Sequence, residues 1–291
     1  HDEVRNISAD GADRLWVTTR GGVSLLEDGR WRSWDGDDGL PANSSVGLLV
    51  DPDTVWVGTA QGACFYRDGT WTPYPLGADG DNPSVLVIFR DSRGRLWFGS
   101  EDSGLYLRDG GEWSHFDSDG PLPSDRVRAV VEDRTGRLCF ATNNGVALLD
   151  GDGWSTLDER HGLRDYDVRT MFVDREENLW FGTVHGGLHK LRDFAFRSYN
   201  RIHGLPANWT RTVAVDSAGV TWLATWGGGL ARLDSAGWRE VRGLPGVERK
   251  QFTSLLVDSR GRLWAGTFGE GVLRLDGSGW RRYGAGDGLP H

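Results

Sequence analysis

The sequence is poor in the residue types that mark several common classes of protein. Two cysteines, Cys64 and Cys139, are too few for a disulfide framework in a chain of 291 residues. No apolar run approaches the roughly 18 residues of a membrane-spanning helix. The 33 basic residues are outnumbered by 42 acidic ones, and a net charge of −9 argues against the basic face that nucleic-acid binding requires.

Glycine and tryptophan are instead abundant, with 43 and 15 copies. This composition, without low complexity, predicts short strands, many turns and a periodic aromatic position. Intrinsic disorder and an all-helical fold are both poor fits. The chain starts at His1 rather than at methionine, so we expect that any signal peptide has been removed or lies outside this sequence.

A sevenfold repeat runs along the chain. Its anchor is a short phrase that ends in threonine or serine and carries tryptophan, or cysteine in one copy, at its second position. The anchor residues are Trp16, Trp56, Trp97, Cys139, Trp180, Trp222 and Trp264. Successive copies are 40, 41, 42, 41, 42 and 42 residues apart, which is the period of a four-stranded propeller blade.

The residues around the anchor divide each copy into four strands. An apolar run ending in aspartate precedes the anchor, as at 127–133, and a glycine followed by a second apolar stretch comes after it, as at 186–191. A pair of aromatic residues spaced by three, such as Trp113 and Phe116, closes most copies. Glycine-containing hairpins join the strands. We therefore predict an all-β fold, a single seven-bladed β-propeller with four antiparallel strands per blade.

The predicted blades cover residues 1–41, 42–81, 82–123, 124–164, 165–206, 207–246 and 247–291. The aspartate that ends each apolar run recurs in every blade, so we interpret it as a cap for the following turn rather than a catalytic group. The anchor tryptophan and threonine are likewise interpreted as blade packing. Cys64 and Cys139 fall in non-adjacent blades and are expected to be buried small hydrophobic residues.

The pattern of an apolar run, Asp-x-x-Gly-x-Leu-Trp-x-Gly-Thr and Gly-Gly-Leu resembles the two-component regulator propeller repeat. Residues 178–188 match that pattern most closely, and the copy with Cys139 matches it least. The resemblance covers the whole chain and implies the periplasmic or extracellular sensor domain of a bacterial hybrid histidine kinase. Such sensors generally carry a second propeller and further domains, so we expect this chain to be a propeller excised from a longer array or an engineered ring.

In a propeller with this strand order, the loops between blades and those after the second strand share one face, here named the loop face. The other face carries only hairpins of repeated sequence, so a specific site is expected on the loop face. Two tryptophans outside the repeat positions, Trp209 and Trp226, lie there in blade six. We expect exposed rings that stack on sugar C–H faces or receive a partner protein's apolar anchor. The alternative is that they pack on the next blade.

Arginine occupies the second position of the first strand in four blades, as Arg5, Arg128, Arg169 and Arg211. This position places the side chains around the channel mouth, where a guanidinium group binds a carboxylate or sulfate through two hydrogen bonds. The alternative is internal pairing with Glu3, Asp125 and Asp167.

Two further loop-face residues, His185 and Tyr166, are candidate ligand contacts. Either would also serve as the base of a lyase in which an arginine neutralises a substrate carboxylate. A hydrolase would need two carboxylates across a cleft, and the candidates are Glu101, Asp102, Asp165, Asp167 and Glu270. His161, His185 and His203 lack the spacing of metal ligands, so we predict no metal. No phosphate-binding loop or nucleophile elbow occurs, and we predict no cofactor.

We predict a ligand-recognition propeller, the extracytoplasmic sensor domain of a signalling protein, that binds an oligosaccharide at the channel mouth. An acidic oligosaccharide is a special case. Trp209 and Trp226 would stack on the ligand, and the polar contacts would come from Arg128, Arg169, Arg211, His185 and Tyr166. The alternatives are a protein–protein scaffold using the same face, a module without its own ligand, and a carbohydrate lyase or hydrolase. We expect neither nucleic acid nor membrane insertion.

Overall fold

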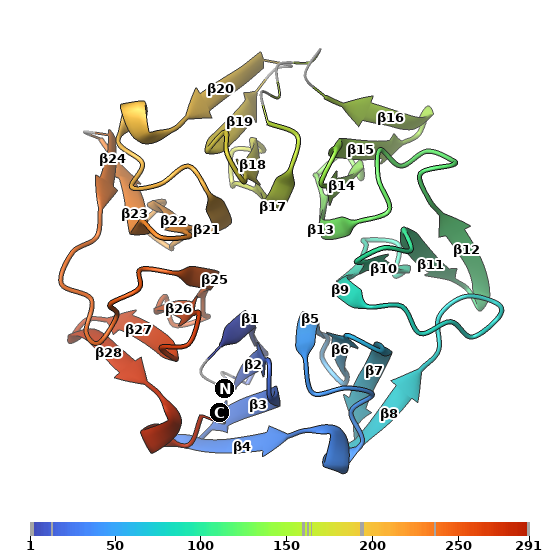
Figure 1. Ribbon diagram of the computed structural model, residues 1–291, viewed down its shortest axis with the longest axis horizontal. Coiled ribbons are helices and arrows are strands. Elements are labelled where there is room, and N and C mark those ends of the chain that lie inside the picture. The colour runs from blue at the N-terminus through green and yellow to red at the C-terminus, as the bar shows by residue number, and fades with distance from the viewer. Residues whose placement is uncertain are drawn as a thin grey trace.

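Seven four-stranded antiparallel sheets surround a central channel in the computed structural model (Figure 1). The structure describes residues 3–12, 14–158, 161, 163, 165–192, 195–235 and 237–289. In each sheet the strands follow one another in chain order from the channel outward. The seven-bladed propeller predicted from the repeat is thereby confirmed. Within the described residues, no helix is long and apolar enough to cross a membrane.

The strands fall into four positions in each blade. The inner strands are β1 (Val4–Ala9), β5 (Ser45–Val50), β9 (Val85–Arg90), β13 (Val127–Glu132), β17 (Val168–Val173), β21 (Thr210–Val215) and β25 (Phe252–Val257). The second strands are β2 (Leu15–Thr19), β6 (Val55–Thr59), β10 (Leu96–Ser100), β14 (Leu138–Thr142), β18 (Leu179–Thr183), β22 (Thr221–Thr225) and β26 (Leu263–Thr267). The third strands are β3 (Gly22–Glu27), β7 (Gly62–Arg67), β11 (Leu105–Asp109), β15 (Gly145–Asp150), β19 (Leu188–Arg192), β23 (Gly229–Asp234) and β27 (Val272–Asp276).

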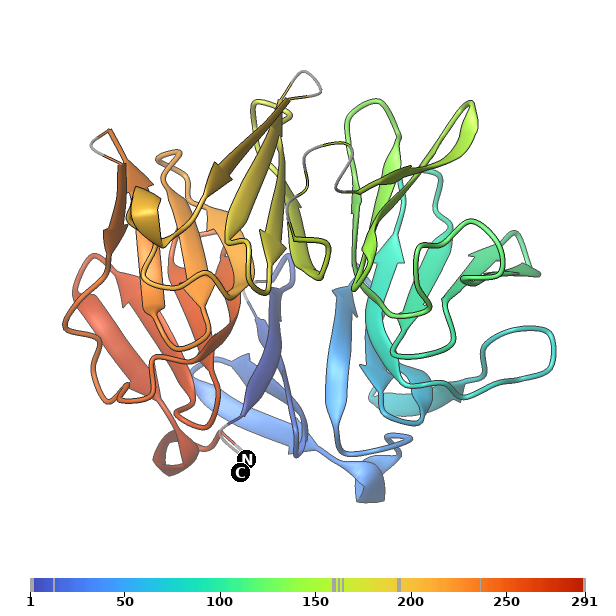
Figure 2. The same ribbon diagram turned by 45° about the horizontal axis from the view of Figure 1, so that its top comes forward.

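The outer strands are β4 (Arg30–Trp34), β8 (Thr70–Tyr74), β12 (Glu112–Phe116), β16 (Gly153–Leu157), β20 (Ala195–Tyr199), β24 (Gly237–Glu240) and β28 (Gly279–Tyr283). Among the fully described elements, short 3-10 turns follow β4, β20 and β28, namely η1 (Gly36–Asp38), η3 (Arg201–His203) and η4 (Ala285–Asp287). Figure 2 shows how strongly the outer strand of a blade is rotated from the inner one, as the right-handed twist of strands requires.

The repeated aspartate fixes both the first hairpin and the anchor tryptophan of its blade. In blade three, Asp91 Oδ1 accepts the backbone N–H groups of Arg93 at 3.0 Å and Arg95 at 2.9 Å. Its Oδ2 accepts the indole N–H of Trp97 at 2.9 Å and Nε of Arg95 at 2.6 Å. The indole bond recurs from Asp10, Asp174, Asp216 and Asp258. The structural interpretation of this aspartate is confirmed for these blades.

Five of the anchor tryptophans, Trp16, Trp56, Trp97, Trp180 and Trp264, pack against the neighbouring blade. Trp97 of blade three lies in one buried cluster with Val127, Val130 and Phe140 of blade four. Trp264 of blade seven packs in the same way against the inner and second strands of blade one. The ring is therefore closed by side-chain packing, without a strand shared between the first and last sheets. Burial of such large apolar side chains is the main stabilising contribution to the ring.

Cys139 takes the place of the anchor tryptophan in blade four, and Cys64 lies on β7. Both thiols are free and fully buried, as predicted. Burial raises the pKa of each thiol to about 12. They are therefore neutral small hydrophobic groups at physiological pH.

We expect the ring to lose stability in acid, at a pH set by the repeated aspartates. Burial raises the pKa of Asp91, but hydrogen bonds from Trp97 and Arg95 outweigh it and hold the pKa below its ordinary value. The same holds for Asp10, Asp133, Asp174 and Asp258. Because the pKa is lower in the folded state, the stabilisation is complete above the unfolded value of about 3.9 and is lost as pH falls through the folded one.

Thermal unfolding followed from pH 7 to pH 3 measures this dependence. The melting temperature should be nearly constant above about pH 5 and fall steeply below about pH 4. A fall that begins near pH 6, where histidine titrates, would contradict the assignment to aspartates.

Candidate functional site

Every inner strand contains a β-bulge at its second residue. In β13, Val127 pairs with Thr142 of β14. Two residues later Ala129 pairs with Ala141, so Arg128 has no partner opposite. A bulge bends its strand and changes the direction of the extra side chain. The same shift occurs in the other six blades.

The seven bulge residues line one cavity of about 490 Å³ in the channel. They are Arg5, Val46, Leu86, Arg128, Arg169, Arg211 and Thr253. Ser44, Ser84 and Glu101 also line the cavity, which places it at the loop-face end of the channel, because these residues precede inner strands or follow a second strand.

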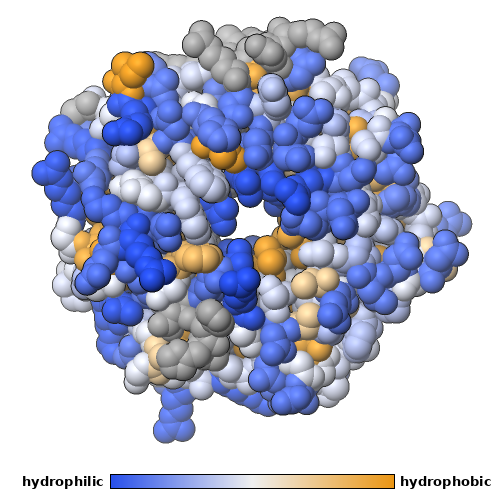
Figure 3. Space-filling model, in the orientation of Figure 1, coloured by the Kyte–Doolittle hydropathy of each residue, from blue (hydrophilic) through white to orange (hydrophobic). Residues whose placement is uncertain are grey.

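The cavity has two chemically different sides. The bulge residues of five consecutive blades, four through seven and then one, are four arginines and a threonine. Blades two and three contribute Val46 and Leu86 instead. In the space-filling view, hydrophilic side chains border most of the central opening, and hydrophobic ones border it near β5 and β9 (Figure 3). We call the five-blade side the cationic arc and the other the apolar arc.

Three of the four arginines in the cationic arc have an internal carboxylate partner. Asp167 forms ion pairs with both Arg128 and Arg169, the second at 3.5 Å between Oδ1 and Nε. Buried Glu3 contacts Nη2 of Arg5 at 2.5 Å. The internal pairing considered from the sequence is thus present for Glu3 and Asp167. Asp125 does not take part in this pairing.

The carboxylate of Asp125 instead binds the loop that joins blades three and four. Its two oxygens accept the backbone N–H of Ser118 at 2.7 Å and the hydroxyl of the same residue at 2.9 Å. Asp125 is therefore a loop-fixing residue and does not neutralise an arginine of the cationic arc.

Arg211 is the exception in the arc. Among the described residues it forms no ion pair, and its guanidinium carbon lies 5.1 Å from the ring centre of Trp226. Burial lowers the pKa of Arg211, and the positive charges of Arg169, Arg5 and Arg128 lower it further, to about 10. The guanidinium groups therefore lie close enough to repel one another across the cavity.

Trp209 and Trp226 are half-buried rather than exposed, which differs from the sequence-based expectation. Their ring centres are 5.6 Å apart, and the ring of Phe268 in blade seven lies 4.9 Å from Trp226. The backbone N–H of Trp226 donates to the carbonyl of Trp209 at 2.9 Å, and Trp226 also forms a β-bridge with Gln251. These contacts hold the pair against the next blade, in agreement with the packing alternative.

The two indole rings support the cationic arc. Arg169 lies 5.9 Å from the ring centre of Trp209, and Arg211 lies over Trp226. A guanidinium held over an aromatic face is both stabilised and oriented. The tryptophans and two of the predicted arginines therefore form one cluster.

His185 and Tyr166 lie in a neighbouring cavity of about 430 Å³, separate from the channel cavity. Both side chains are exposed, Tyr166 by 48%. Asp165 lines the same cavity, and its Oδ2 accepts the backbone N–H groups of His185 at 2.5 Å and Gly186 at 2.8 Å. Asp167 lines this second cavity and pairs with arginines of the first, so it connects the two groups of predicted residues.

The other two loop-face histidines hold turns. His161 Nδ1 lies 3.0 Å from Asp158 Oδ1, and His203 Nδ1 lies 2.9 Å from Asn200 Oδ1. In the described part of the chain, no group of three or more His, Cys, Asp and Glu side chains is placed to hold a metal ion.

The final sequence-based choice of site residues omitted Arg5, Thr253 and Ser254, which line the channel cavity. The hydroxyl oxygens of Thr253 and Ser254 and the Nε atom of Arg5 are buried without a hydrogen-bond partner, as is Nε of Arg169. The register of the inner strands could have revealed Thr253, because it occupies the same second position as the arginines.

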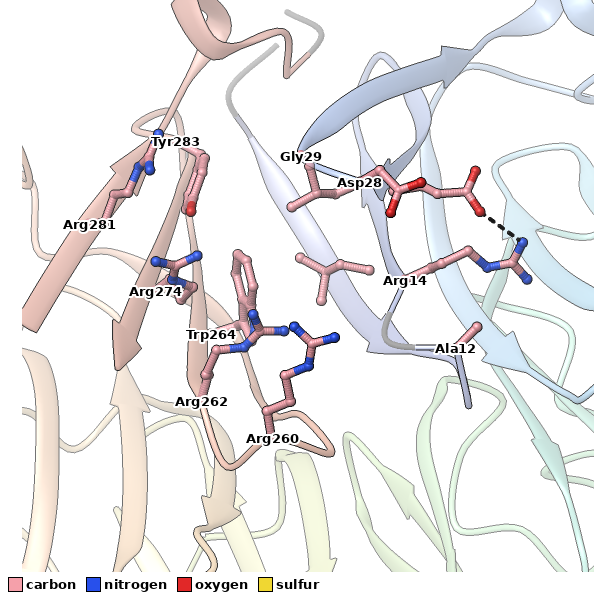
Figure 4. Close-up of a pocket in the computed structure, with 13 residues that line it drawn as sticks. Ala12, Arg14, Asp28, Gly29, Arg260, Arg262, Trp264, Arg274, Arg281 and Tyr283 are labelled. Carbon is pink, nitrogen blue, oxygen red and sulfur yellow. Dashed lines mark hydrogen bonds and ion pairs between the residues drawn. The ribbon is translucent and has the colours of Figure 1, made fainter. Parts of the chain in front are cut away.

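A second arginine-rich cavity, of about 470 Å³, lies on the hairpin face between blades seven and one. Figure 4 shows Arg260, Arg262, Arg274 and Arg281 of blade seven opposite Arg14 of blade one. Three of these arginines already bind carboxylates of their own blades: Arg14 with Asp10, Arg262 with Asp258 and Arg274 with Asp276. Two of those pairs belong to the repeated hairpin, so this cavity is largely a product of blade structure.

Comparison with known proteins agrees with this architecture. The family model described as two component regulator propeller matches residues 79–102, 162–185 and 246–269. The matches fall on the inner and second strands of blades three, five and seven. No curated protein is detectably similar to the chain in sequence.

Solved structures share the fold at low sequence identity. The extracellular domain of a hybrid two-component system from B. thetaiotaomicron is 21% identical with a TM-score of 0.84, over 94% of this chain and 39% of that one. A one-component system's extracellular domain from the same organism is 20% identical with a TM-score of 0.60, over 97% of this chain and 43% of that one. The chain thus spans about two fifths of the length of these sensors. A streptogramin B lyase is 14% identical with a TM-score of 0.74, over 91% of both chains.

Both the sensor domains and a lyase therefore share the propeller fold of this chain. The sensor resemblance is also found in sequence, because the matched segments contain the anchor phrase and the apolar run before it. The chain is a seven-bladed propeller in which segments of blades three, five and seven match the two component regulator propeller model.

Proposed function

We propose that the chain is an extracytoplasmic ligand-recognition domain of a bacterial signalling protein, and that it binds an oligosaccharide at the loop-face end of the channel. The observation that carries the proposal is the channel cavity, which collects buried hydrogen-bonding groups that form no hydrogen bond within the described part of the chain. Buried polar groups in folded proteins are nearly always paired, so unpaired ones gathered around a cavity are typical of a binding site.

The two sides of the cavity suit a sugar. Sugar hydroxyl and acidic groups would pair with the cationic arc, and the C–H face of a ring would lie against the apolar arc. Exposed edges of Trp209 and Trp226 would extend the contact, since indole rings pack well against sugar C–H groups. His185 and Tyr166 would contact a longer ligand that reaches the neighbouring cavity.

The sensor role draws on the family model and on the sensor domains that share the fold. In this role the propeller binds its ligand without changing it chemically, and the bound state is the signal that the rest of the protein receives. A protein partner on the same face is the main alternative, and it would need no deep pocket.

A lyase is the second candidate, favoured by the fold shared with streptogramin B lyase. The exposed Tyr166 and His185 lie beside Asp167, which pairs with Arg128 and Arg169. A base next to arginines is the arrangement that proton abstraction beside a carboxylate needs. Unchanged ligand recovered after long incubation would exclude this activity for the sugar tested.

A thermal-shift screen of neutral and acidic oligosaccharides tests the proposed function. A ligand at 100 times its dissociation constant should stabilise the folded state by about 2.7 kcal/mol. The shift should be strongly reduced in Trp226→Ala, because the indole contacts Arg211 and lies beside the cavity. Arg93→Ala, in an exposed hairpin on the other face, is the matched control and should keep the shift. If no sugar shifts the melting temperature, the oligosaccharide proposal is wrong. The result would then support a scaffold that binds a protein partner or a module without its own ligand.

A further inference from the structure

Charge balance in the cationic arc leaves one place without a counter-ion. Asp167 serves Arg128 and Arg169 at one end of the arc, and Glu3 serves Arg5 at the other. Arg211 lies between these two pairs and has no carboxylate partner among the described residues. The four guanidinium groups of the arc and their two carboxylate partners leave a local charge of about +2 in a chain whose net charge is −9. Glu101, which also lines the cavity, does not change this balance because it is paired with Arg126.

Several buried hydrogen-bond donors around Arg211 also form no hydrogen bond among the described residues. Blade seven follows Arg211 in the ring and contributes the hydroxyls of Thr253 and Ser254, which are buried and unpaired. The Nε–H groups of Arg5 and Arg169, on either side, are buried and form no hydrogen bond among the described residues. Nε of Arg169 lies 3.5 Å from Oδ1 of Asp167, which is an ion pair without a hydrogen bond. An unsatisfied buried donor is costly, and one oxyanion would accept bonds from several of these donors at once.

The guanidinium group of Arg211 is held ready for such a contact. Its carbon lies 5.1 Å from the ring centre of Trp226, and Trp226 is itself fixed between Trp209 and Phe268. A planar donor group already oriented by an aromatic ring loses little freedom when a ligand binds.

A neutral ligand would leave the positive charge of the cationic arc uncompensated. It would bury the arginines further without compensating their charge, and desolvation of an uncompensated charge opposes binding. The apolar arc limits the anionic part of a ligand to the opposite side of the cavity, because Val46 and Leu86 offer no donor to a charged group.

We infer that the channel mouth is an anion site centred on Arg211, completed by Thr253 and Ser254, and that the oligosaccharide of the proposed function carries a carboxylate or sulfate there. The sugar part of this inference rests on the proposed function, whereas the anion site does not. Arg211 is the principal charged contact. Arg5 and Arg169 complete the site through their Nε–H groups, which form no hydrogen bond among the described residues.

Isothermal titration of three probes in low-salt buffer tests the inference. The probes are inorganic sulfate, an oligogalacturonate, and the same oligosaccharide with its carboxylates methyl-esterified. The variant is Arg211→Met, which removes the charge and keeps an unbranched side chain. The matched control is Arg232→Met, an exposed arginine on β23 of the same blade.

We expect oligogalacturonate to bind the wild type at least tenfold more tightly than its methyl ester. Arg211→Met should weaken oligogalacturonate binding by about 30-fold or more, the usual loss when one partner of a buried charge pair is removed. Arg232→Met should bind as the wild type does. Sulfate should bind weakly to the wild type and not measurably to Arg211→Met.

The outcomes separate the two proposals. Equal binding of the ester and the acid would overturn the anion site and leave the sugar site standing. Arg211-dependent binding of sulfate without binding of either sugar would support the anion site and count against the oligosaccharide. No binding of any probe would overturn both.

The melting temperature of Arg211→Met and the pH dependence of wild-type affinity test the anion site independently. Arg211→Met should fold and melt at a higher temperature than the wild type, because it removes a buried charge without a counter-ion. In the wild type, affinity should stay constant from about pH 7 to 9 and fall above about pH 10, where Arg211 begins to lose its proton. A loss of affinity between pH 6 and 8 would assign recognition to a histidine instead.

Discussion

Gly104→Ala should destabilise the propeller by about 3 kcal/mol or more, whereas Gly94→Ala in the same blade should cost only about 1 kcal/mol. Both glycines have positive φ, 72° at Gly104 and 83° at Gly94. A Cβ at Gly104 would lie 2.2 Å from the carbonyl oxygen of Phe116 on the outer strand, whereas a Cβ at Gly94 meets nothing within 4 Å. Gly94→Ala therefore reports the cost of a left-handed backbone alone. Gly104→Ala reports that cost together with the steric clash between the new Cβ and the carbonyl oxygen of Phe116.

Urea unfolding followed by tryptophan fluorescence measures both variants. The difference between them reports the close approach of the third strand to the outer strand in blade three. The same approach recurs at Gly22, Gly187 and Gly271. Equal losses for the two variants would show that the collision is relieved by movement of the outer strand, and that this glycine is not required by packing.

Asp91→Ala is expected to cost about 3 kcal/mol of stability, against less than about 1 kcal/mol for Asp51→Ala. Asp91 is 4% exposed, and its removal leaves the indole N–H of Trp97 and two backbone N–H groups without an acceptor. Asp51 lies in the shorter hairpin of blade two, where its carboxylate pairs with the partly exposed Arg90 instead of the anchor tryptophan.

The comparison of these two aspartates has a spectroscopic control. Asp91→Ala should also change the fluorescence of the folded protein, because it removes a hydrogen bond to a fully buried indole. A similar stability loss in both variants would mean that the aspartate stabilises the protein through the hairpin alone. The hydrogen bond between the aspartate and the tryptophan six residues later would then add no stability.

That spacing also explains why the fold could be predicted from the sequence. The aspartate, the hairpin glycine and the tryptophan belong to one hydrogen-bonded unit within about seven consecutive residues, so each copy carries its own structural signature. Seven such units at a regular period leave one architecture that satisfies all of them.

The site was harder to predict, because its geometry arises between repeats. Arg128 and Arg211 could be placed at the channel mouth from their position in the inner strand. The burial of Trp226 depends on Phe268 of the following blade, and that of Trp209 depends on Trp226, which nothing in the local sequence reveals. His185 and Tyr166 share the loop face with the arginines but open into a different cavity, and that separation depends on loop conformations.

The bulge explains how one position in the repeat varies while the sheet stays the same. It releases the second residue of each inner strand from pairing and directs it into the channel, where its identity is free to vary without disturbing the sheet. The same backbone feature therefore presents valine, leucine, threonine or arginine in different blades. Seven side chains that differ between blades therefore line the cavity of an otherwise uniform ring.

The most direct test of an anion site at Arg211 is a crystal of the wild-type protein soaked in selenate, with the anion located by its anomalous signal. We expect a peak in the channel cavity, within hydrogen-bond distance of the guanidinium group of Arg211 and the hydroxyl of Thr253. An empty channel with selenate bound instead between Arg260 and Arg281 on the hairpin face, or bound nowhere, would contradict it.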